Sequence, residues 1–229
     1  LVRARALRKY TGKANFVAAL LPVWRPFLNS LWATLHTHDQ NKKAAEKGKH
    51  APPKRRIWTK QIKPSLLFIR AFLTVRRKAT TMTYNLDDYY GDHEWVIIAV
   101  DASPWGLGGV LYINGVCVAW FSSALTAEDE RRFGYKLGDH RGQQTWEALA
   151  ALVALRAWAP WLSTVRYQLE VKSDSMVALT LLSKLKAKGS GTGMLAQEVA
   201  LDICSGLYDP RVLRHTPGIS NVLPDALSR

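Results

Sequence analysis

The chain has 229 residues, 48% of them hydrophobic, and a formal net charge of +14 at pH 7. This length suffices for one large core and a smaller neighbouring one. No apolar run reaches the roughly 18 residues of a membrane-spanning helix, and no signal peptide is recognisable, so we expect no membrane partner. Cys117 and Cys204 form no metal or disulfide pattern, which favours an intracellular location, cytoplasmic or nuclear. Because the chain begins at Leu1 rather than Met, we expect a fragment or a processed product.

The excess positive charge is confined to the first part of the chain. Residues 1–91 contain 19 Lys and Arg against 4 Asp and Glu, whereas residues 92–229 contain 13 against 14. This asymmetry favours a nucleic acid that one part of the chain holds and the other part modifies. A basic surface that only aids solubility is the alternative interpretation.

The first part is predicted to be helical. Residues 1–38 contain two amphipathic patterns, and Pro22 and Pro26 interrupt the helix between them. Residues 58–94 begin with another basic amphipathic pattern, over 58–78, and end in a polar connector. Together these segments predict a small basic helical region.

A polar segment over residues 39–57 separates those helices and is predicted to be an exposed linker. Its basic side chains are typical of a segment that contacts phosphates. The residues that we predict to bind nucleic acid are Lys42, Lys43, Lys54, Arg55 and Arg56.

The second part opens on an unbroken apolar run, residues 95–100, which Asp101 follows directly. A short apolar run that is rich in β-branched residues predicts a strand buried on both faces. A lone carboxylate at the end of such a strand is costly to bury, so it requires a cation or a strong donor nearby. We interpret Asp101 as the first ligand of a divalent metal ion, and a strand-end Asp that caps a turn is the alternative.

A hairpin follows this strand. Gly106, Gly108 and Gly109 are expected to let the backbone bend into a strand over 110–113. The dipeptide Asn114-Gly115 is a strong hairpin signal, and a strand over 116–121 follows it. The polar residues 122–142 predict a long loop with at most a helical turn.

Three further acids stand at comparable places later in the chain. Glu147 lies at the margin of an apolar helical face, Asp174 ends a strand, and Asp225 belongs to the last predicted helix. The remaining elements are predicted as a helix over 143–159 that Pro160 ends, a strand over 167–173, a helix around 179–182, a flexible glycine-rich break at 189–193, a helix over 196–207, a strand over 211–214 and a final helix around Pro224.

These acids stand in four motifs: Asp101-Ala102-Ser103 with its glycines, Trp146-Glu147-Ala148-Leu149, Ser173-Asp174-Ser175, and His215-Thr216-Pro217-Gly218 with Asn221 and Asp225-Ala226-Leu227-Ser228-Arg229. Through them, residues 95–229 resemble the ribonuclease H domain of retroelement reverse transcriptases. More weakly, Thr11-Gly12-Lys13-Ala14-Asn15-Phe16 and Arg25-Pro26-Phe27-Leu28 resemble the thumb- or connection-like segment between polymerase and ribonuclease H. The element would be of the long-terminal-repeat or the tyrosine-recombinase (DIRS-like) kind.

The resemblance implies an α/β, ribonuclease H-like fold, with a mixed five-stranded sheet flanked by helices. It also implies a metal-dependent endonuclease that hydrolyses the RNA strand of RNA–DNA hybrids, with the upstream polymerase domain as a second partner. Its metal-binding and catalytic acids would be Asp101, Glu147, Asp174 and Asp225, and His215 would be the mobile histidine of the family. Carboxylates suit two Mg²⁺ ions, for which Mn²⁺ can substitute, and two ions can activate water and stabilise the leaving oxygen.

Two other classes remain. A catalytically silent ribonuclease H-like module could bind nucleic acid inside a larger assembly, but all four acids are present. A strand-transferring integrase of the same general fold would lack the combination of the hairpin with a final Asp, and the His-Thr-Pro-Gly tail, and both are present. The sequence departs from the family at Pro224, in the long 122–142 segment and in lacking a basic protrusion after the helix that follows Asp174. The basic tract at 42–56 could supply those contacts to the nucleic-acid substrate.

Overall fold

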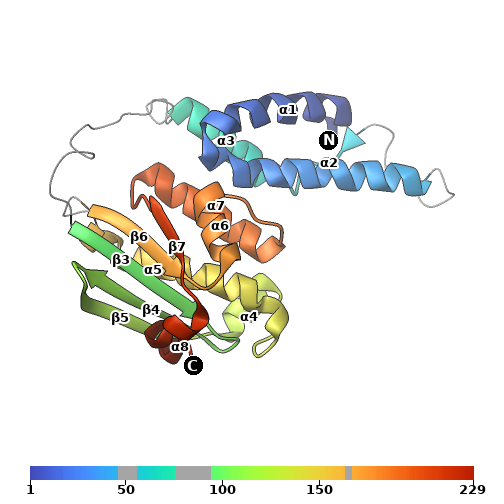
Figure 1. Ribbon diagram of the computed structural model, residues 1–229. Coiled ribbons are helices and arrows are strands. Elements are labelled where there is room, and N and C mark those ends of the chain that lie inside the picture. The colour runs from blue at the N-terminus through green and yellow to red at the C-terminus, as the bar shows by residue number, and fades with distance from the viewer. Residues whose placement is uncertain (46–55, 76–93, 163–166) are drawn as a thin grey trace. The chain divides into compact units, whose positions relative to one another are not determined.

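The computed structural model describes residues 1–45, 56–75, 94–162 and 167–229 (Figure 1). The chain divides into two compact units, Leu1–Thr83 and Tyr84–Arg229, each of which is described by itself. The sequence places this boundary at 94/95, and the division falls earlier, in a segment outside the described residues. Within the described residues, no helix combines the length and the apolar content that a membrane span requires.

The first unit consists of three helices and a short two-stranded sheet. Its elements are β1 (Val2–Arg3), α1 (Ala4–Leu20), the 3₁₀ turn η1 (Pro22–Trp24), α2 (Arg25–Ala45), β2 (Arg56–Ile57) and α3 (Lys63–Val75). β1 pairs antiparallel with β2. Phe27 of α2 stacks on Phe68 of α3 with ring centroids 3.6 Å apart, and Trp24 meets Phe72 edge-on. The basic helical region that the sequence predicts is therefore a packed unit with its own small core.

Two boundaries in this unit differ from the prediction. α2 continues to Ala45, so the linker expected from residue 39 begins later. No glycine or proline interrupts residues 39–45, and the carboxylate of Asp39 accepts two hydrogen bonds from Arg8 that tie α2 to α1. α3 begins at Lys63 rather than at residue 58, with Pro64 in its first turn, where its missing N–H costs nothing.

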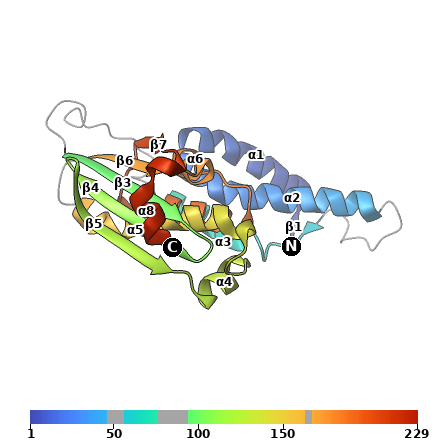
Figure 2. The ribbon, with the colours of Figure 1, turned by 60° about the horizontal axis from the view of Figure 1, so that its bottom comes forward.

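The second unit is a five-stranded sheet with helices on its faces (Figure 2). The sheet order is β5-β4-β3-β6-β7, with antiparallel pairing from β3 to β5 and parallel pairing of β6 with β3 and β7. This arrangement is the mixed sheet of a ribonuclease H-like α/β fold, as predicted. Its elements are β3 (Glu94–Ala102), β4 (Gly106–Ile113), β5 (Val116–Ala124), α4 (Ala127–Phe133), η4 (His140–Gly142), α5 (Gln143–Leu162), β6 (Tyr167–Ser173), α6 (Met176–Lys184), α7 (Ser190–Ser205), β7 (Val212–His215), η5 (Gly218–Ser220) and α8 (Val222–Ser228).

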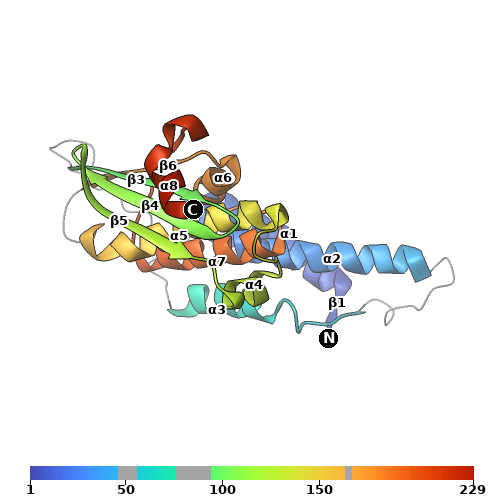
Figure 3. The same ribbon diagram turned by 90° about the horizontal axis from the view of Figure 1, so that it is seen from below.

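α5 and α8 lie on opposite faces of the sheet (Figure 3). Successive residues of a strand point to opposite faces. Gly108 of β4 lies against α8, whereas the space beside Gly109 is filled by Phe121, whose ring meets Trp158 of α5 5.7 Å away. The α5 face carries most of the core, and the short α8 covers only part of the other face.

The glycines of β4 serve this packing rather than a bend. The strand begins at Gly106, not at residue 110, so three of these glycines lie within it. A side chain on Gly106 would come 2.8 Å from the carbonyl oxygen of Ser228, and one on Gly108 would overlap the carbonyl oxygen of Pro224. Without Cβ atoms at these positions, α8 packs directly on the backbone of β4.

Three other expectations are corrected. Pro160 does not end α5, which runs on to Leu162, so the helix tolerates a proline within its last turn. Residues 122–142 are not mainly loop: they hold the end of β5, the 3₁₀ turn η4, and α4, which begins with a capping box. The glycine-rich run at 189–193 begins α7, where Gly191 allows close approach to Thr145 of α5.

Candidate active site

The four predicted acids come from four different elements of the second unit. Asp101 lies near the end of β3, and Asp174 directly follows β6. Because β3 and β6 are parallel neighbours, both acids stand at the same edge of the sheet. Glu147 comes from α5 on one face and Asp225 from α8 on the other. The topology therefore collects acids that are far apart in the sequence.

The pKa of Asp101 reflects its burial and the nearness of the other acids. The residue is buried, with 7% of its surface exposed. Burial, followed by the charge of Asp174, raises the pKa of Asp101 to about 7. Asp225 and Glu147 raise it further, against a lowering hydrogen bond from the backbone of Ala102. A carboxylate in this position is stabilised in its charged form by a bound cation.

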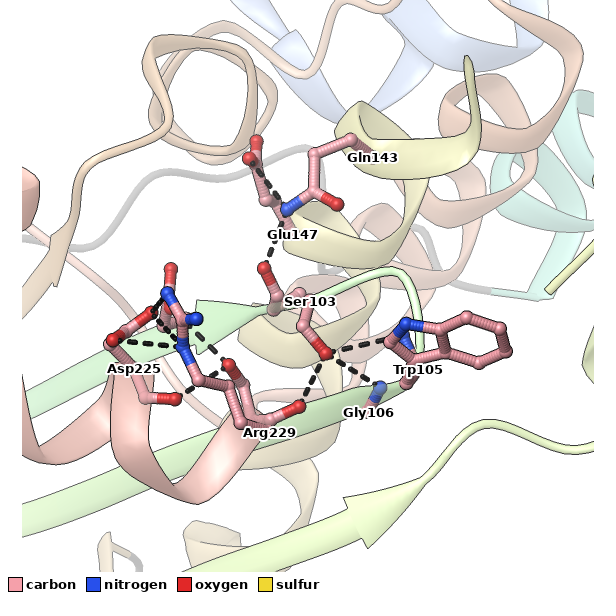
Figure 4. Close-up of polar contacts among 10 residues, drawn as sticks. Ser103, Trp105, Gly106, Gln143, Glu147, Asp225 and Arg229 are labelled. Carbon is pink, nitrogen blue, oxygen red and sulfur yellow. Dashed lines mark hydrogen bonds and ion pairs between the residues drawn. The ribbon is translucent and has the colours of Figure 1, made fainter. Parts of the chain in front are cut away.

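Glu147 is half-buried and held by neighbouring polar groups. The side-chain amide of Gln143 donates to Glu147 Oε1, 3.3 Å away, and also to the carbonyl oxygen of Ala102 (Figure 4). Burial raises the pKa of Glu147, the hydrogen bonds with Ser175 and Gln143 lower it, and the charge of Asp174 raises it. Gln143 thus links the first turn of α5 to the end of β3.

Asp174 carries the least satisfied oxygen of the group. Its Oδ1 is buried and has no hydrogen-bond partner within the described residues. The turn after β7 approaches its other oxygen, since a Cβ on Gly218 would lie 3.4 Å from Asp174 Oδ2. A buried carboxylate oxygen without a partner costs free energy, so it favours a site that takes a further ligand.

Asp225 is about half-exposed and is paired with Arg229, one helical turn later. Nε of Arg229 lies 3.1 Å from both carboxylate oxygens, and its Nη2 lies 2.9 Å from Oδ1 (Figure 4). Among the described residues, no ion pair joins Asp101, Glu147 or Asp174 to a Lys or Arg.

Three side chains hold α8 on the sheet and so position Asp225. Asn221 donates to the carbonyl oxygen of Val100, 3.0 Å away, at the start of the helix. Ser122 of β5 donates to the carbonyl oxygen of Leu227 at 2.6 Å, and Ser103 donates to that of Ser228. These hydroxyls satisfy the carbonyls that a helix end leaves free. Asn221 and Ser103 belong to the sequence motifs described above, but the sequence indicates no such role for them or for Ser122.

His215 is the exposed last residue of β7 and pairs across the sheet with Ser173. The N–H of Thr216 donates to the carbonyl oxygen of Ser173, 3.0 Å away. This pairing places His215 beside the residue that precedes Asp174, at the same edge of the sheet as the acids.

The predicted nucleic-acid-binding residues are only partly described. The side chains of Lys42 and Lys43, and the whole of Lys54 and Arg55, lie outside the described residues. Arg56 is exposed on β2, where it pairs with Arg3 of β1. All five belong to the first unit, whose helix α1 also exposes Arg5, Lys9 and Lys13.

The donor set of the four acids fits a hard divalent cation, because carboxylate oxygens are what Mg²⁺ and Mn²⁺ prefer. The unpartnered oxygen of Asp174 and the raised pKa of Asp101 both favour a bound cation. Within the described part of the chain, however, no three His, Cys, Asp or Glu side chains already form a metal-binding group. One of these acids, Asp225, is held by Arg229 instead.

No family model matches the chain, and no curated protein matches it. Solved structures do match. Ribonuclease H1 from the archaeon Halobacterium salinarum is 21% identical, over 58% of this chain and 93% of that one, with a TM-score of 0.42. LC11 ribonuclease H1 in complex with an RNA/DNA hybrid is 19% identical, over 58% and 92%, with a TM-score of 0.46.

A longer match is the foamy viral protease–reverse transcriptase in complex with double-stranded DNA. It is 16% identical, over 80% of this chain and 37% of that one, with a TM-score of 0.31. The structural neighbours thus include ribonucleases H and a viral reverse transcriptase, and the fold of the second unit is assigned from its own strand order.

Proposed function

We propose that this chain is the ribonuclease H region of a retroelement reverse transcriptase and that it hydrolyses the RNA strand of RNA–DNA hybrids in a metal-dependent reaction. The observation that carries the proposal is the meeting of four carboxylates, from four elements, around the buried Asp101. Acids are gathered in this way at a cost in free energy, which is offset when cations bind between them. We propose an intracellular location, in the cytoplasm or the nucleus.

Asp101, Glu147, Asp174 and Asp225 would hold the metal, with two Mg²⁺ ions expected and Mn²⁺ able to substitute. When bound, such ions lower the pKa of water and stabilise charge on the leaving oxygen. Gln143 supports this set because it orients Glu147 against the end of β3.

His215 would move a proton during turnover. It is exposed at the edge of the sheet where Asp174 stands, and imidazole can accept and release protons in the neutral range. Metal binding does not require it, because four acids are already present.

The first unit would hold the substrate. Arg5, Lys9 and Lys13 are exposed on α1, and Arg56 is exposed on β2. Such cations bind phosphates without regard to base sequence, and a hybrid is recognised by its shape and 2′-hydroxyls. The polymerase domain of the same polyprotein would be the second partner.

The test is cleavage of an end-labelled RNA, presented as a hybrid with DNA, as a single strand and as an RNA duplex. We expect cleavage of the hybrid with Mg²⁺ or Mn²⁺ and none with a chelator. Cleavage of the hybrid that persists in the chelator, or cleavage of all three RNAs at equal rates, would contradict the proposal.

A second candidate is a silent module that binds hybrid without cutting it. The observation that favours it is that the described acids do not yet form a metal-binding group and that Asp225 is paired with Arg229. Tight hybrid binding without cleavage, across a range of Mg²⁺ and Mn²⁺ concentrations, would select this candidate.

A further inference from the structure

Arg229 is already bound to Asp225, one of the proposed metal ligands. Its guanidinium makes three hydrogen bonds to the carboxylate of Asp225, and its Nε contacts both oxygens. A carboxylate held in this way directs its oxygens toward the guanidinium rather than toward the other acids.

The charge of Arg229 also reaches the centre of the site. Hydrogen bonding to Asp225 is the main cause that raises the pKa of Arg229, and the charge of Asp101 adds to it. In the described residues, no Lys or Arg forms an ion pair with the other three acids. Arg229 is therefore the basic residue that is ion-paired with this group of acids.

The pair is built to be reversible. The two residues are four apart on α8, an arrangement that favours an acid followed by a base. Both side chains are well exposed, 72% for Arg229 and 42% for Asp225, and exposed pairs of this kind are weak. A divalent ion bound by several carboxylates therefore competes with it easily.

The backbone next to Arg229 is held in place, whereas its side chain is 72% exposed. Ser122 and Ser103 bind the carbonyls of Leu227 and Ser228, the two residues that precede it. A planar guanidinium with fixed charge matches a phosphate better than an ammonium does. Once released from Asp225, Arg229 would stand at the site where a nucleic-acid backbone must approach the acids.

We propose that Arg229 is a built-in counter-cation of Asp225, which it gives up to a divalent ion, and that the freed guanidinium then binds a phosphate of the nucleic acid beside the site. This inference rests on the proposed function, since it assumes that the acids bind metal and that a nucleic acid lies against them.

The first test is a calorimetric titration of Mn²⁺ into the chain without nucleic acid. Arg229→Gln should bind Mn²⁺ about two- to fivefold more tightly than the unmodified chain, the scale of a weak exposed ion pair. The matched control is Arg211→Gln, which removes another exposed Arg–Asp pair, with Nε 2.8 Å from Asp209 Oδ2, just before β7. The control should leave Mn²⁺ affinity unchanged.

The second test is hybrid binding in Ca²⁺ over a series of salt concentrations. Arg229→Gln should bind several-fold more weakly, and its salt dependence should fall by about one phosphate contact, roughly 0.9 in the logarithmic slope on a B-form duplex. Arg229→Lys keeps the charge but loses the planar fork, so it should recover part of the affinity.

The outcomes separate the two proposals. If Arg229→Gln binds Mn²⁺ with unchanged or lower affinity, Arg229 does not compete with metal and the inference is wrong. If it equals Arg211→Gln in hybrid binding, the phosphate contact is wrong. If the unmodified chain binds neither Mn²⁺ nor hybrid, the proposed function itself fails, and the inference fails with it.

Discussion

The two helices that carry acids to the site are held in opposite ways. α5 has 20 residues, and more than half of them are buried, among them Trp146, which is fully enclosed. α8 has seven residues, and its Val222 and Leu223 are 64% and 53% exposed. A helix of two turns is not stable by itself in water, so α8 depends on what it touches.

The contacts of the two helices differ in kind. α5 is held by hydrophobic packing, with Phe133 and Tyr135 against the indole of Trp146. α8 is held by side-chain hydrogen bonds to backbone, from Ser103 and Ser122 at its end and from Asn221 at its start. Glu147 therefore moves only if the core moves, whereas Asp225 can be displaced while the rest of the unit stays folded. The predictions below test this difference.

The largest effect is expected at Asp174, which stands at the edge of the sheet where α5 and α8 bring their acids. Asp174→Asn removes a charge from a crowded group, so folding should be preserved, while hybrid cleavage should fall by about 10³-fold or more, the scale of losing a principal electrostatic element. Cleavage with Mg²⁺ and circular dichroism measure the two effects. Near-normal cleavage by this variant would remove Asp174 from the site.

Trp146→Ala tests the packing that holds α5. Truncating a fully buried tryptophan should lower the free energy of unfolding by about 3–5 kcal/mol, measured by urea denaturation. Trp120→Ala is the control, because that side chain is 65% exposed on β5 and should change stability by no more than about 0.5 kcal/mol. Equal losses for the two variants would mean that Trp146 does not anchor the core.

Asp101→Asn tests the electrostatic cost of gathering the acids. An acid whose pKa rises from 3.8 to about 7 on folding binds more protons when folded, so the stability it contributes falls as pH rises through that window. Asparagine does not titrate. In a chelator, the variant should therefore gain stability relative to the unmodified chain as pH rises from about 4 to about 7, by at most about 1.4 kcal/mol for each pH unit. A constant difference in urea denaturation across this window would argue against the raised pKa.

The sequence predicts the sheet well because its signals are local. The apolar run before Asp101, the Asn114-Gly115 hairpin and the strand before Asp174 each specify a strand over a few residues. Strand-end acids then follow from the parallel pairing of β3 with β6. The set of acids was predictable for that reason, together with the family resemblance.

The contacts that hold α8 on the sheet could not be predicted, because they join distant parts of the chain. Ser103 and Ser122 reach residues more than 100 positions later, and a serine in a strand gives no sign of such a partner. Gly106 and Gly108 were interpreted as a bend, since the helix that packs on them is not visible from their neighbours. The pair of Asp225 with Arg229 was the exception: its spacing of four on a helix can be seen in the sequence.

Ser122→Ala tests a single contact that holds α8 on the sheet, and it should give the smallest effect. The substitution removes one hydrogen bond to the carbonyl of Leu227, so stability should fall by only about 1 kcal/mol. Asp225 would lose part of its positioning, and cleavage should drop by up to about tenfold, since small displacements of a ligand are costly in catalysis.

Ser183→Ala is the matched control, because its exposed hydroxyl bonds a carbonyl within its own helix, α6. That variant should keep normal cleavage. If Ser122→Ala also cleaves at the normal rate, the hydroxyl does not position Asp225, and α8 would then be held by its packing on the glycines of β4. If Ser122→Ala instead unfolds the second unit as readily as Trp146→Ala does, α8 belongs to the core, and the contrast between the two helices is wrong.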